Sequence, residues 1–535
     1  MLRTLLLVAL CMYAPVNGHK ILVTCLGASG SQNLIMYRLA DMLGARGNDV
    51  TVLKWKIFPE AKGIKLEYAK EIIYPMIEDD QLLEQIRVKT GETPWIEEQS
   101  AFDIDFSFIN RVLTAFKGGC SRFLNDTTHP AQKQFMSTKY DAIVIHALDF
   151  CSFGLAKVVN NPSTIWMSTA FMIDPLAKYS GVPFPASFVP TAMSTFTDKM
   201  TFPQRIINFV QTGVFTSAVE YFVLSGYTEL FRAKYGDDFP SIPDLMRETQ
   251  LYFINADPFF EYARPTQHNV IYMGGMTMQK PEPMNEEWTK LLENAPGEGI
   301  VVFSLGSVAR TEYMPIEKKE ALVKAFAKFP QFTFFFRIDG DVPTLPKNVR
   351  HIGWMPQKEL LGHPKVKAFI THAGYNSLTE ATFLGVPLIM LPLFGDQPSN
   401  AKRVERLGLG VSLDRLSLTV ESIESALSTV LLDKGYKERA MRLSQMIQQK
   451  PVQSADLALK WVEFLAQFRT VDNLLPESRH MGWVQYHSLD VISILILAVF
   501  LIFFLMYKLV CCCCCRCCRR SGSSSADAQK KRKHE

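Results

Sequence analysis

Short apolar runs alternate with longer amphipathic segments along most of the chain. The runs have the length of buried strands, whereas the longer segments repeat apolar residues at helical spacing. Strands are predicted at residues 21–25, 50–53, 140–146, 164–167, 251–256, 300–305, 332–337, 351–354, 367–371 and 388–391. Helices are predicted at residues 34–43, 153–159, 316–329, 377–384, 420–432, 437–449 and 457–468. This alternation predicts doubly wound α/β domains built on parallel sheets.

A Pro-rich stretch without periodicity, at residues 278–285, divides the alternation into two halves, and we interpret it as a linker. The halves then form an N-terminal domain at residues 19–280 and a C-terminal domain at residues 286–470, with a cleft between them. We expect the last helix of the second half, at residues 457–468, to cross back to the first domain.

Residues 201–224 are predicted to form an unusually apolar helix with few charges. A helix buried in the core is the first interpretation of such a segment. The alternative is a helix that lies on the membrane surface, where an apolar ligand could enter from the lipid.

Both ends of the chain resemble targeting segments. Residues 1–18 combine a basic start, an apolar core and a small-residue cleavage site, which is typical of a secretory signal peptide. Residues 491–510 are almost continuously apolar and long enough to cross a bilayer, and the tail at residues 511–535 is basic. Because positive charge favours the cytosolic side, we expect a single-pass type I membrane protein with a lumenal body.

The extreme C-terminus refines this localisation. Lys531 and Lys533 resemble a dibasic retrieval signal, so we expect the protein in the endoplasmic reticulum membrane. A solvated run of charges is the alternative. The net charge of +4 over 535 residues, much of it in the tail, does not favour a nucleic-acid partner.

Cysteine usage fits this topology. Seven of the eleven cysteines lie at the cytosolic edge of the predicted span: Cys511, Cys512, Cys513, Cys514, Cys515, Cys517 and Cys518. Palmitoylation is expected there, with structural metal binding as the alternative. Cys25, Cys120 and Cys151 remain in the mature body and allow at most one disulfide. Asn125 begins an Asn-Asp-Thr glycosylation sequon, which is usable only in a lumenal protein.

The densest polar pattern lies at residues 369–397, FITHAGYNSLTEATFLGVPLIMLPLFGDQ. A glycine turn between a parallel strand and a helix presents backbone N–H groups and a positive dipole end to an anion, and such a turn is predicted around Gly374. Polar side chains gather at the ends of the same elements: His372, Asn376, Glu380, Asp396 and Gln397.

The spacing F-x-T-H-x-G-x-x-S-x-x-E, followed by Pro387, Pro392 and Asp396-Gln397, resembles the signature of the UDP-glycosyltransferase family. From about His19 to the tail the chain looks like the membrane-bound UDP-glucuronosyltransferase branch of that family. The resemblance implies the GT-B fold, in which the N-terminal half binds the acceptor and the C-terminal half binds the nucleotide sugar.

The resemblance also implies roles for residues of the C-terminal half. Trp354 would stack on uracil, Gln357 would bond the uracil edge or the ribose, and Glu380 would accept from the ribose hydroxyls. Asp396 and Gln397 would bind the hexose hydroxyls. The predicted diphosphate ligands are Ser307, His372, Asn376 and the backbone of Gly374 and Ser377.

Two of these residues have alternative interpretations. Trp354 alone would be a core side chain, and His372 alone could be a metal ligand, but no partners lie at ligand spacing around it. We expect no metal and no cofactor, because a helix terminus can stabilise the leaving diphosphate and the UDP-sugar is a co-substrate.

Inverting glycosyl transfer needs a base on the acceptor hydroxyl. The family places a His after the first strand and an acidic residue at the end of strand 140–146, and here these positions fall on Gln32 and His146. Gln32 cannot take a proton. Either His146 is the base with Asp149 as its orienting partner, or the acceptors are amines or acidic hydroxyls, or the protein binds UDP-sugar without turnover. For His146, a satisfied strand-end histidine is a further alternative.

The sequence therefore predicts an inverting hexosyltransferase that conjugates small lipophilic acceptors, as in detoxification. Glucuronate is favoured as the sugar, and UDP-glucose is the alternative donor. A non-catalytic UDP-sugar-binding partner of active relatives is the alternative function, and homo- or hetero-oligomers are further expected partners.

Overall fold

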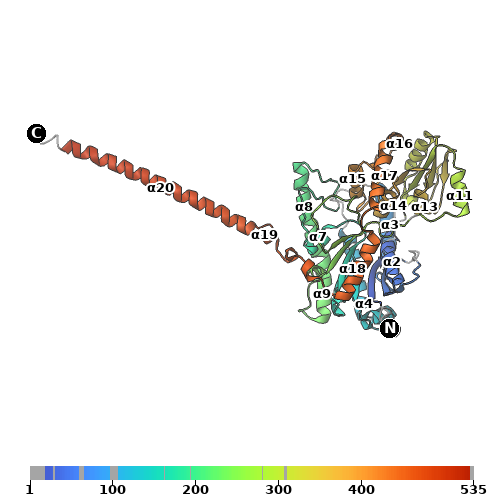
Figure 1. Ribbon diagram of the computed structural model, residues 1–535, viewed down its shortest axis with the longest axis horizontal. Coiled ribbons are helices and arrows are strands. Elements are labelled where there is room, and N and C mark those ends of the chain that lie inside the picture. Colours follow the sequence, from blue (N-terminus) through green and yellow to red (C-terminus); the bar gives the residue numbers. More distant parts are fainter. Residues whose placement is uncertain are drawn as a thin grey trace, which may run out of the picture. The chain divides into compact units, whose positions relative to one another are not determined.

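The computed structural model describes residues 18–27, 30–58, 65–96, 106–161, 163–192, 194–279, 281–306 and 310–530. For residues 30–32, 96, 106 and 514–530 it describes only the backbone. The chain divides into two units, Met1–Pro476 and Glu477–Glu535. The first unit contains both sheets, and the second contains a long C-terminal helix (Figure 1).

Seven parallel strands form the N-terminal sheet, in the order β3-β2-β1-β4-β5-β6-β7. They are β1 (Lys20–Gly27), β2 (Asp49–Lys56), β3 (Lys70–Pro75), β4 (Ala142–His146), β5 (Thr164–Ser168), β6 (Leu251–Ile254) and β7 (Val270–Tyr272). Strands β1 and β4 pair with Val23 opposite Val144. Because the strand order reverses between them, the sheet is doubly wound, and its ligand-binding edge is expected where β1 and β4 end.

Six parallel strands form the C-terminal sheet, in the order β10-β9-β8-β11-β12-β13. They are β8 (Gly299–Ser304), β9 (Phe332–Arg337), β10 (Val349–His351), β11 (Val366–Thr371), β12 (Leu388–Met390) and β13 (Gly410–Ser412). The order reverses between β8 and β11, which pair with Ser304 opposite Thr371. The prediction of two doubly wound sheets is confirmed.

The helices connect the strands and cover the sheets. In the N-terminal half they are α2 (Gly30–Ala45), α3 (Asp80–Ile96), α4 (Phe106–Asn125), α5 (Pro130–Ser137), α6 (Cys151–Val158), α7 (Asp174–Ser180), α8 (Phe202–Ala218), η1 (Val219–Leu224), α9 (Ser225–Tyr235) and α10 (Ile242–Arg247). In the C-terminal half they are α11 (Glu286–Glu293), η2 (Thr311–Tyr313), α12 (Ile316–Ala327), α13 (Gln357–Leu361), α14 (Tyr375–Leu384), α15 (Gln397–Arg406), α16 (Val420–Leu432), α17 (Lys434–Gln448), α18 (Ser454–Phe468) and η3 (Asp472–Leu474).

The central strands are buried on both faces. In β1, Leu22 belongs to one apolar cluster, whereas Ile21 and Val23 belong to another. In β8, Val302 and Phe303 likewise lie in different clusters. Successive side chains of a strand point to opposite faces, so a strand covered on both sides reads as an unbroken apolar run. This is why the central strands were predictable.

The edge strands were not predictable in the same way. The structure adds β3, β7 and β13, and it places β10 at Val349–His351 rather than at residues 351–354. All four lie at the outer edges of the two sheets. An edge strand is short or half exposed, so it lacks the continuous apolar run that identifies a buried strand.

Helix α18 returns to the N-terminal sheet, as expected. Leu459 and Val462 pack in the same buried cluster as Ile21. The Arg46 guanidinium pairs with the Glu463 carboxylate at 2.8 Å. The C-terminal end of the folded body is therefore built into the first sheet, while the exact domain limits stay a prediction.

The carboxyl ends of the two sheets face each other. Glu261 follows β6 of the first sheet, and it contacts Tyr375 and Arg403, which lie on the helices after β11 and β12 of the second sheet. Phe171, which follows β5, packs against both Tyr375 and Arg403. Ligand-binding edges of doubly wound sheets lie at these carboxyl ends, so the topology brings two such edges together.

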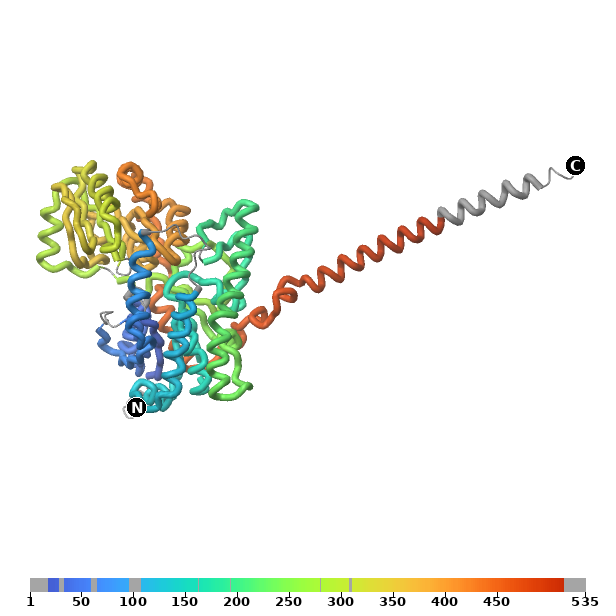
Figure 2. Tube along the Cα trace, turned by 180° about the vertical axis from the view of Figure 1, so that it is seen from behind, coloured from blue at the N-terminus to red at the C-terminus, as the bar shows by residue number. Residues whose placement is uncertain are grey.

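Helices α8, η1 and α9 form one continuous rod along the outside of the first unit (Figures 1 and 2). Asn208 is the one buried residue of Phe202–Ala218. Apolar residues such as Phe202 and Val214 are more than half exposed. A helix buried in the core, the first interpretation of residues 201–224, is therefore wrong, because the apolar residues face outward.

The second unit contains η4 (Glu477–Arg479), α19 (Trp483–Tyr486) and α20 (Leu489–Lys530). Within α20, Leu489–Cys513 is long and apolar enough to cross a membrane, with a hydropathy of 3.0. The predicted span at residues 491–510 lies inside this segment. By length and composition alone, Phe202–Tyr235 is also long and apolar enough to cross a membrane, although it is less apolar than Leu489–Cys513.

Candidate functional site

The C-terminal site lies at the carboxyl ends of β8, β11 and β12, which are neighbours in the sheet. We use this name for Gly306, Arg337, Trp354, Gln357, His372, Gly374, Asn376, Ser377, Glu380, Asp396 and Gln397. The strand order reverses between β8 and β11, so the site occupies the position where open α/β sheets bind ligands. Ser307, also predicted to belong here, lies outside the described residues.

The turn after β11 has an unusual backbone conformation. Ala373 is fully buried and has a φ of 63°, in the left-handed region that favours glycine. Gly374 is the N-cap of α14, and because it has no side chain it cannot cap the first N–H groups of the helix. Helix α14 therefore begins at Tyr375, two residues earlier than predicted. Because first-turn N–H groups of a helix point outward with the positive end of the dipole, this turn forms an anion-binding geometry. Asn376 lies within this first turn, partly buried.

The His372 ring lies between two glycines. A Cβ atom added to Gly306 would approach the ring to 2.7 Å, and one added to Gly374 would approach Nε2 to 2.3 Å. Burial lowers the pKa of His372 to about 4, so the imidazole is neutral near pH 7. A neutral imidazole has one N–H donor, which can serve a diphosphate oxygen.

The Gln357 side chain contacts both Ser377 and Glu380. The Gln357 Nε2 amide donates to Glu380 Oε2 at 2.7 Å and to Ser377 Oγ at 3.4 Å. Burial raises the pKa of Glu380 to about 7, and the bond from Gln357 partly opposes this rise. A carboxylate held in this way has lone pairs left to accept from neighbouring hydroxyls.

Trp354 is 79% exposed, so it is not a core side chain. The Arg337 guanidinium carbon lies 5.2 Å from the centre of its ring. Arg337 also donates to the Gly306 carbonyl at 3.3 Å, which links the ring to the glycine beside His372. An exposed indole fixed at a ligand-binding edge offers a flat apolar surface on which a base can stack.

Asp396 and Gln397 are positioned through buried bonds. Asn400 Nδ2 donates to Asp396 Oδ2 at 2.7 Å and to the Ala373 carbonyl at 3.1 Å, so it joins the start of α15 to the turn after β11. Burial raises the pKa of Asp396. Gln397 Oε1 accepts from the N–H groups of Leu393 and Phe394, which leaves its amide NH₂ as the group that could reach a ligand.

Sequence reasoning missed Arg337 and Asn400. Arg337 ends β9, where only proximity in the sheet connects it to the site. Asn400 lies four residues after Asp396 on α15, and this helical spacing was a usable signal.

A buried ion pair lies behind the C-terminal site. Arg403 Nε is 3.0 Å from Glu261 Oε1, and the Tyr375 hydroxyl donates to the same carboxylate at 3.2 Å. The side chains of Arg403 and Glu261 are 6% and 10% exposed. Tyr375 is the first residue of α14, so this contact ties the start of α14 to the N-terminal half.

In the N-terminal sheet, the strand order reverses between β1 and β4, and His146 ends β4. His146 Nδ1 accepts from the Leu148 N–H at 3.2 Å, so the neutral ring carries its proton on Nε2. Nε2 has no hydrogen-bond partner among the described residues. Burial lowers the pKa of His146 to about 4. This arrangement makes His146 a donor at Nε2 and a weak base. Gln32 lies in the first turn of α2, and its side chain is outside the described part of the chain.

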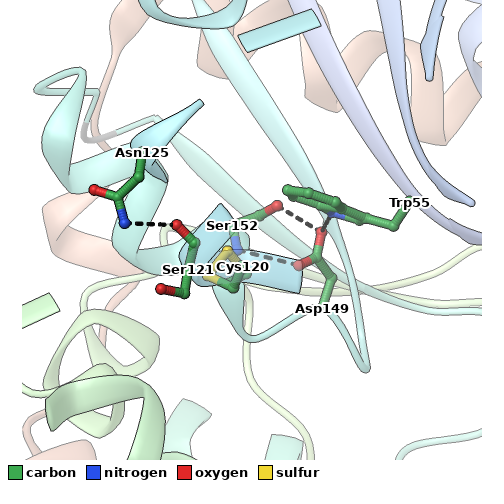
Figure 3. Close-up of a disulfide and its surroundings, with 7 residues drawn as sticks. Trp55, Cys120, Ser121, Asn125, Asp149 and Ser152 are labelled. Carbon is green, nitrogen blue, oxygen red and sulfur yellow. Dashed lines mark hydrogen bonds between the residues drawn. A yellow bond between two sulfur atoms is a disulfide. The ribbon is translucent and has the colours of Figure 1, made fainter. Parts of the chain in front are cut away.

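Asp149 is bonded away from the His146 ring. Its carboxylate accepts from Trp55 Nε1 at 2.8 Å and from the Ser152 hydroxyl at 2.5 Å (Figure 3). Its contact with His146 in the described residues is through the backbone, where the Asp149 N–H donates to the His146 carbonyl. Burial raises the pKa of Asp149. These bonds do not favour Asp149 as the residue that orients an imidazole.

A disulfide between Cys120 and Cys151 holds the same region (Figure 3). It joins α4 to the first residue of α6, two residues after Asp149. Cys25 is a buried free thiol. The single disulfide that the sequence allowed is therefore formed by Cys120 and Cys151.

Asn125, the predicted glycosylation site, ends α4 and is exposed. Its Nδ2 donates to the Ser121 carbonyl at 2.9 Å, and its Oδ1 accepts from Lys234. Within the described residues, no group of three or more His, Cys, Asp or Glu side chains is arranged to hold a metal ion.

Solved glycosyltransferases share this fold. The structure of the glycotransferase of kitacinnamycin aligns with a TM-score of 0.58 at 17% identity, covering 85% of this chain and 100% of that one. The glycosyltransferase SnogD from Streptomyces nogalater aligns with a TM-score of 0.54 at 18% identity, covering 84% and 100%. The chain therefore has the GT-B glycosyltransferase fold, as predicted.

Sequence comparison identifies the family. The family model described as UDP-glucoronosyl and UDP-glucosyl transferase matches residues 19–524. UDP-glucuronosyltransferase 1A6 from Homo sapiens is 35% identical over 92% of this chain and 90% of its own length. The mouse UDP-glucuronosyltransferase 1A6 is also 35% identical, over 92% of each chain. The chain belongs to this family of UDP-sugar-dependent glycosyltransferases.

Proposed function

We propose that the protein transfers a glucuronosyl group from UDP-glucuronate, with inversion at the anomeric carbon, to small lipophilic acceptors. The observation that carries this proposal is the convergence of Trp354, His372 and Glu380 at one sheet edge of a family member. The relatives named above are glucuronosyltransferases, which favours glucuronate over glucose.

In this proposal each group of the C-terminal site binds one part of the donor. Trp354 stacks on uracil, Gln357 bonds the uracil edge or the ribose, and Glu380 accepts from the ribose hydroxyls. The diphosphate lies at the N-terminus of α14, where the helix dipole and the His372 N–H stabilise the charge that develops on the leaving UDP. Asp396 and the Gln397 amide bind the hexose. Ser307 and Asn376 are the remaining proposed diphosphate ligands.

The attacking group of the acceptor determines how much base catalysis is needed. Gln32 cannot accept a proton, and the Nδ1 lone pair of His146 is occupied by the Leu148 N–H. We therefore favour acceptors that need little help, namely amines or acidic hydroxyls. The same two residues support the second candidate function, a UDP-sugar-binding protein without turnover.

We further propose a type I topology in the endoplasmic reticulum membrane, with a cleaved signal peptide, a lumenal body and a cytosolic, palmitoylated tail. The Cys120–Cys151 disulfide supports an oxidising compartment, and the exposed Asn125 side chain is accessible to a glycan. Mobility shift after endoglycosidase treatment tests this topology. Asn125→Gln and Thr127→Ala should each abolish the shift, and a shift that survives both would contradict the glycan assignment.

The test of activity is UDP release in microsomes that express the protein, with UDP-glucuronate or UDP-glucose and a panel of phenols, alcohols and amines. We expect acceptor-dependent release with UDP-glucuronate, greatest for amines and acidic phenols. Equal turnover of weakly acidic alcohols would contradict the proposed acceptor class. UDP binding without release above an empty-vector control would favour the non-catalytic function. Preference for UDP-glucose would overturn the sugar assignment.

A further inference from the structure

Helix α3 has its two ends packed in different halves of the molecule. Near its start, Leu82 and Leu83 are buried in the same apolar cluster as Phe123 of α4. Near its end, Trp95 is 3% exposed and belongs to the apolar cluster that contains Phe303 of the C-terminal sheet. The 17 residues of this helix span roughly 25 Å. One element therefore reaches from the N-terminal half to the C-terminal half.

Trp95 is the contribution of the N-terminal half to this cluster. Among the described residues, every other buried member lies between Val301 and Val430. Two of these members, Leu305 and Met314, flank the connection from β8 to α12 at residues 305–315. A buried aromatic side chain removes roughly 150–250 Å² of surface from water. Apolar packing therefore fixes the end of α3 beside the β8–α12 connection.

Gly91, one turn earlier in α3, packs against the same connection. A Cβ atom added to Gly91 would approach two carbons of the Tyr313 ring to 2.8 Å and Arg310 Cδ to 3.3 Å. Glycine destabilises the interior of a helix relative to alanine, so a buried helical glycine usually permits a close contact. Here that contact is with the Tyr313 ring of η2. We call Gly91, Trp95 and Tyr313 the α3 clasp.

The Tyr313 side of the α3 clasp is bonded to the C-terminal site. In η2, the buried Thr311 hydroxyl oxygen accepts from the Asp339 N–H at 2.7 Å. Asp339 lies two residues after Arg337, which donates to the Gly306 carbonyl and lies over the Trp354 ring. A short series of contacts therefore leads from α3 through η2 to the surfaces proposed for diphosphate and uracil.

The α3 clasp reaches a different part of the C-terminal site from the buried ion pair. The Glu261–Arg403 pair and Tyr375 connect the N-terminal half to the helices after β11 and β12. The α3 clasp instead contacts the connection after β8, which begins beside Gly306. The two contacts thus hold the two sides of the strand-order reversal separately.

We propose that Gly91 and Trp95 are positioning residues for donor binding. By holding Tyr313, they fix the β8–α12 connection in the conformation that receives the UDP moiety. The inference rests on the proposed function of the C-terminal site, and it adds that the N-terminal half contributes to donor affinity without touching the donor. A contact that only stabilised the fold would leave the UDP affinity of the folded protein unchanged.

The test is calorimetric titration of the full-length chain with UDP in detergent micelles at pH 7.5. Gly91→Leu introduces a good helix former whose Cβ has to displace the Tyr313 ring. We expect UDP affinity to fall roughly two- to thirtyfold, as for substitutions that act on a site through intervening contacts. The KM for UDP-glucuronate should rise by a similar factor, and kcat should change less.

Two further variants separate positioning from overpacking. Trp95→Leu removes the indole without adding volume and should also weaken UDP binding. Tyr313→Ala should weaken it as well, and adding Gly91→Leu to Tyr313→Ala should cause no further loss, because Gly91 acts through that ring. Gly213→Leu is the matched control, since an added Cβ at this helical glycine meets nothing within 4 Å, and it should bind UDP as the wild type does.

Thermal midpoints, measured for every variant, show the effect on stability separately. Unchanged UDP affinity in both Gly91→Leu and Trp95→Leu, with lowered thermal midpoints, would overturn the proposal and leave the α3 clasp a structural contact. Additive losses from Gly91→Leu and Tyr313→Ala would overturn it too, because the glycine would then not act through the ring. Failure of the wild type to bind UDP would instead refute the proposed function of the C-terminal site, and this inference with it.

Discussion

The Gln357 amide donates to the Glu380 carboxylate at 2.7 Å and thereby fixes α13 against α14. The same carboxyl has a pKa raised to about 7 by burial. A buried acid with one donor is only partly satisfied, and the ribose hydroxyls of the proposed donor would supply further donors. The residue proposed to recognise the nucleotide is therefore a source of instability in the unliganded protein.

Glu380→Gln should separate the effect of this carboxylate on stability from its effect on UDP binding. The folded pKa of Glu380 lies above the usual value of 4.5, so the contribution of Glu380 to stability falls as pH rises from about 4.5 to 7, where only the unfolded state ionises freely. The variant should lack this slope and be the more stable protein at pH 8 by thermal denaturation. Its affinity for UDP should be roughly ten- to a hundredfold weaker at pH 8, because bonds to a charged acceptor are lost.

Calorimetric titration with UDP between pH 5.5 and 8 checks the predicted effect on UDP affinity. We expect the ratio of wild-type to variant affinity to increase with pH through about 7, because the second ionisation of UDP, with a pKa of about 6, affects both proteins equally. A parallel pH dependence in both proteins would show that another group titrates on binding.

Gly374→Ala tests the position of His372. Gly374 has a φ of −63°, which alanine adopts without strain, so the effect comes from the Cβ atom 2.3 Å from Nε2. Overpacking of this kind costs about 1–3 kcal/mol, and displacing the ring should weaken UDP binding. Adding His372→Ala should recover thermal stability relative to the single variant while UDP binding stays weak.

Gly213→Ala is the matched control, because a Cβ at that glycine meets nothing within 4 Å. If Gly374→Ala melts and binds UDP as the wild type does, the ring moves freely and its proposed role as a positioned donor fails.

The sequence predicted most of the C-terminal site because its residues sit at fixed distances from strand ends. His372 follows β11 directly, and Glu380 lies on the helix that β11 enters. The sequence did not indicate that Arg337 belongs to the site, because Arg337 ends β9, a strand of a different βα unit. Only the pairing of β9 with β8 brings it close to Gly306. Long-range pairing leaves no local spacing to read.

The structure of the N-terminal half was also harder to predict from the sequence. Edge strands such as β3 expose part of their residues, so they lack a buried-strand pattern. Helix α8 is as apolar as a core helix, and only its contacts show that the inward row is polar. Composition reports how apolar a helix is, whereas the fold decides which face meets water.

Loss of the Cys120–Cys151 disulfide should destabilise the N-terminal half. The bond closes a sequence separation of 31 residues, for which chain entropy gives roughly 3–4 kcal/mol. Cys120→Ser should lower the thermal midpoint, and dithiothreitol should lower that of the wild type equally while leaving the variant unchanged. Cys512→Ser, at an exposed free thiol, is the control. A reductant effect that persists in Cys120→Ser would point to a different bond.

Arg403→Met should lower the free energy of unfolding by more than most surface substitutions do. It leaves the Glu261 carboxylate buried and unpaired, which costs about 3–5 kcal/mol. The double variant Arg403→Met/Glu261→Gln should lose less than the single one in denaturant unfolding. Lys324→Met, which breaks an exposed pair with Glu320, should cost about 1 kcal/mol or less. Equal losses for the two single variants would show that the pair does not connect the halves energetically.

His146→Asn separates a structural histidine from a catalytic base. The asparagine oxygen can accept from the Leu148 N–H as Nδ1 does, but it cannot take a proton at neutral pH. Because Nδ1 is occupied and the pKa is lowered to about 4, we expect kcat within a few fold of the wild type between pH 6 and 8. A base at this position would contribute roughly 100- to 10,000-fold.

The stability of the same variant gives an independent check. The folded pKa of His146 lies below its usual 6.5, so the wild type is destabilised as pH falls from about 6.5 toward 4, when the unfolded chain binds the proton first. His146→Asn should lose this acid sensitivity in thermal melts. A drop in kcat beyond a hundredfold, with thermal midpoint and UDP affinity unchanged at pH 7.5, would instead assign His146 as the base, and the acceptors would then not need to be acidic.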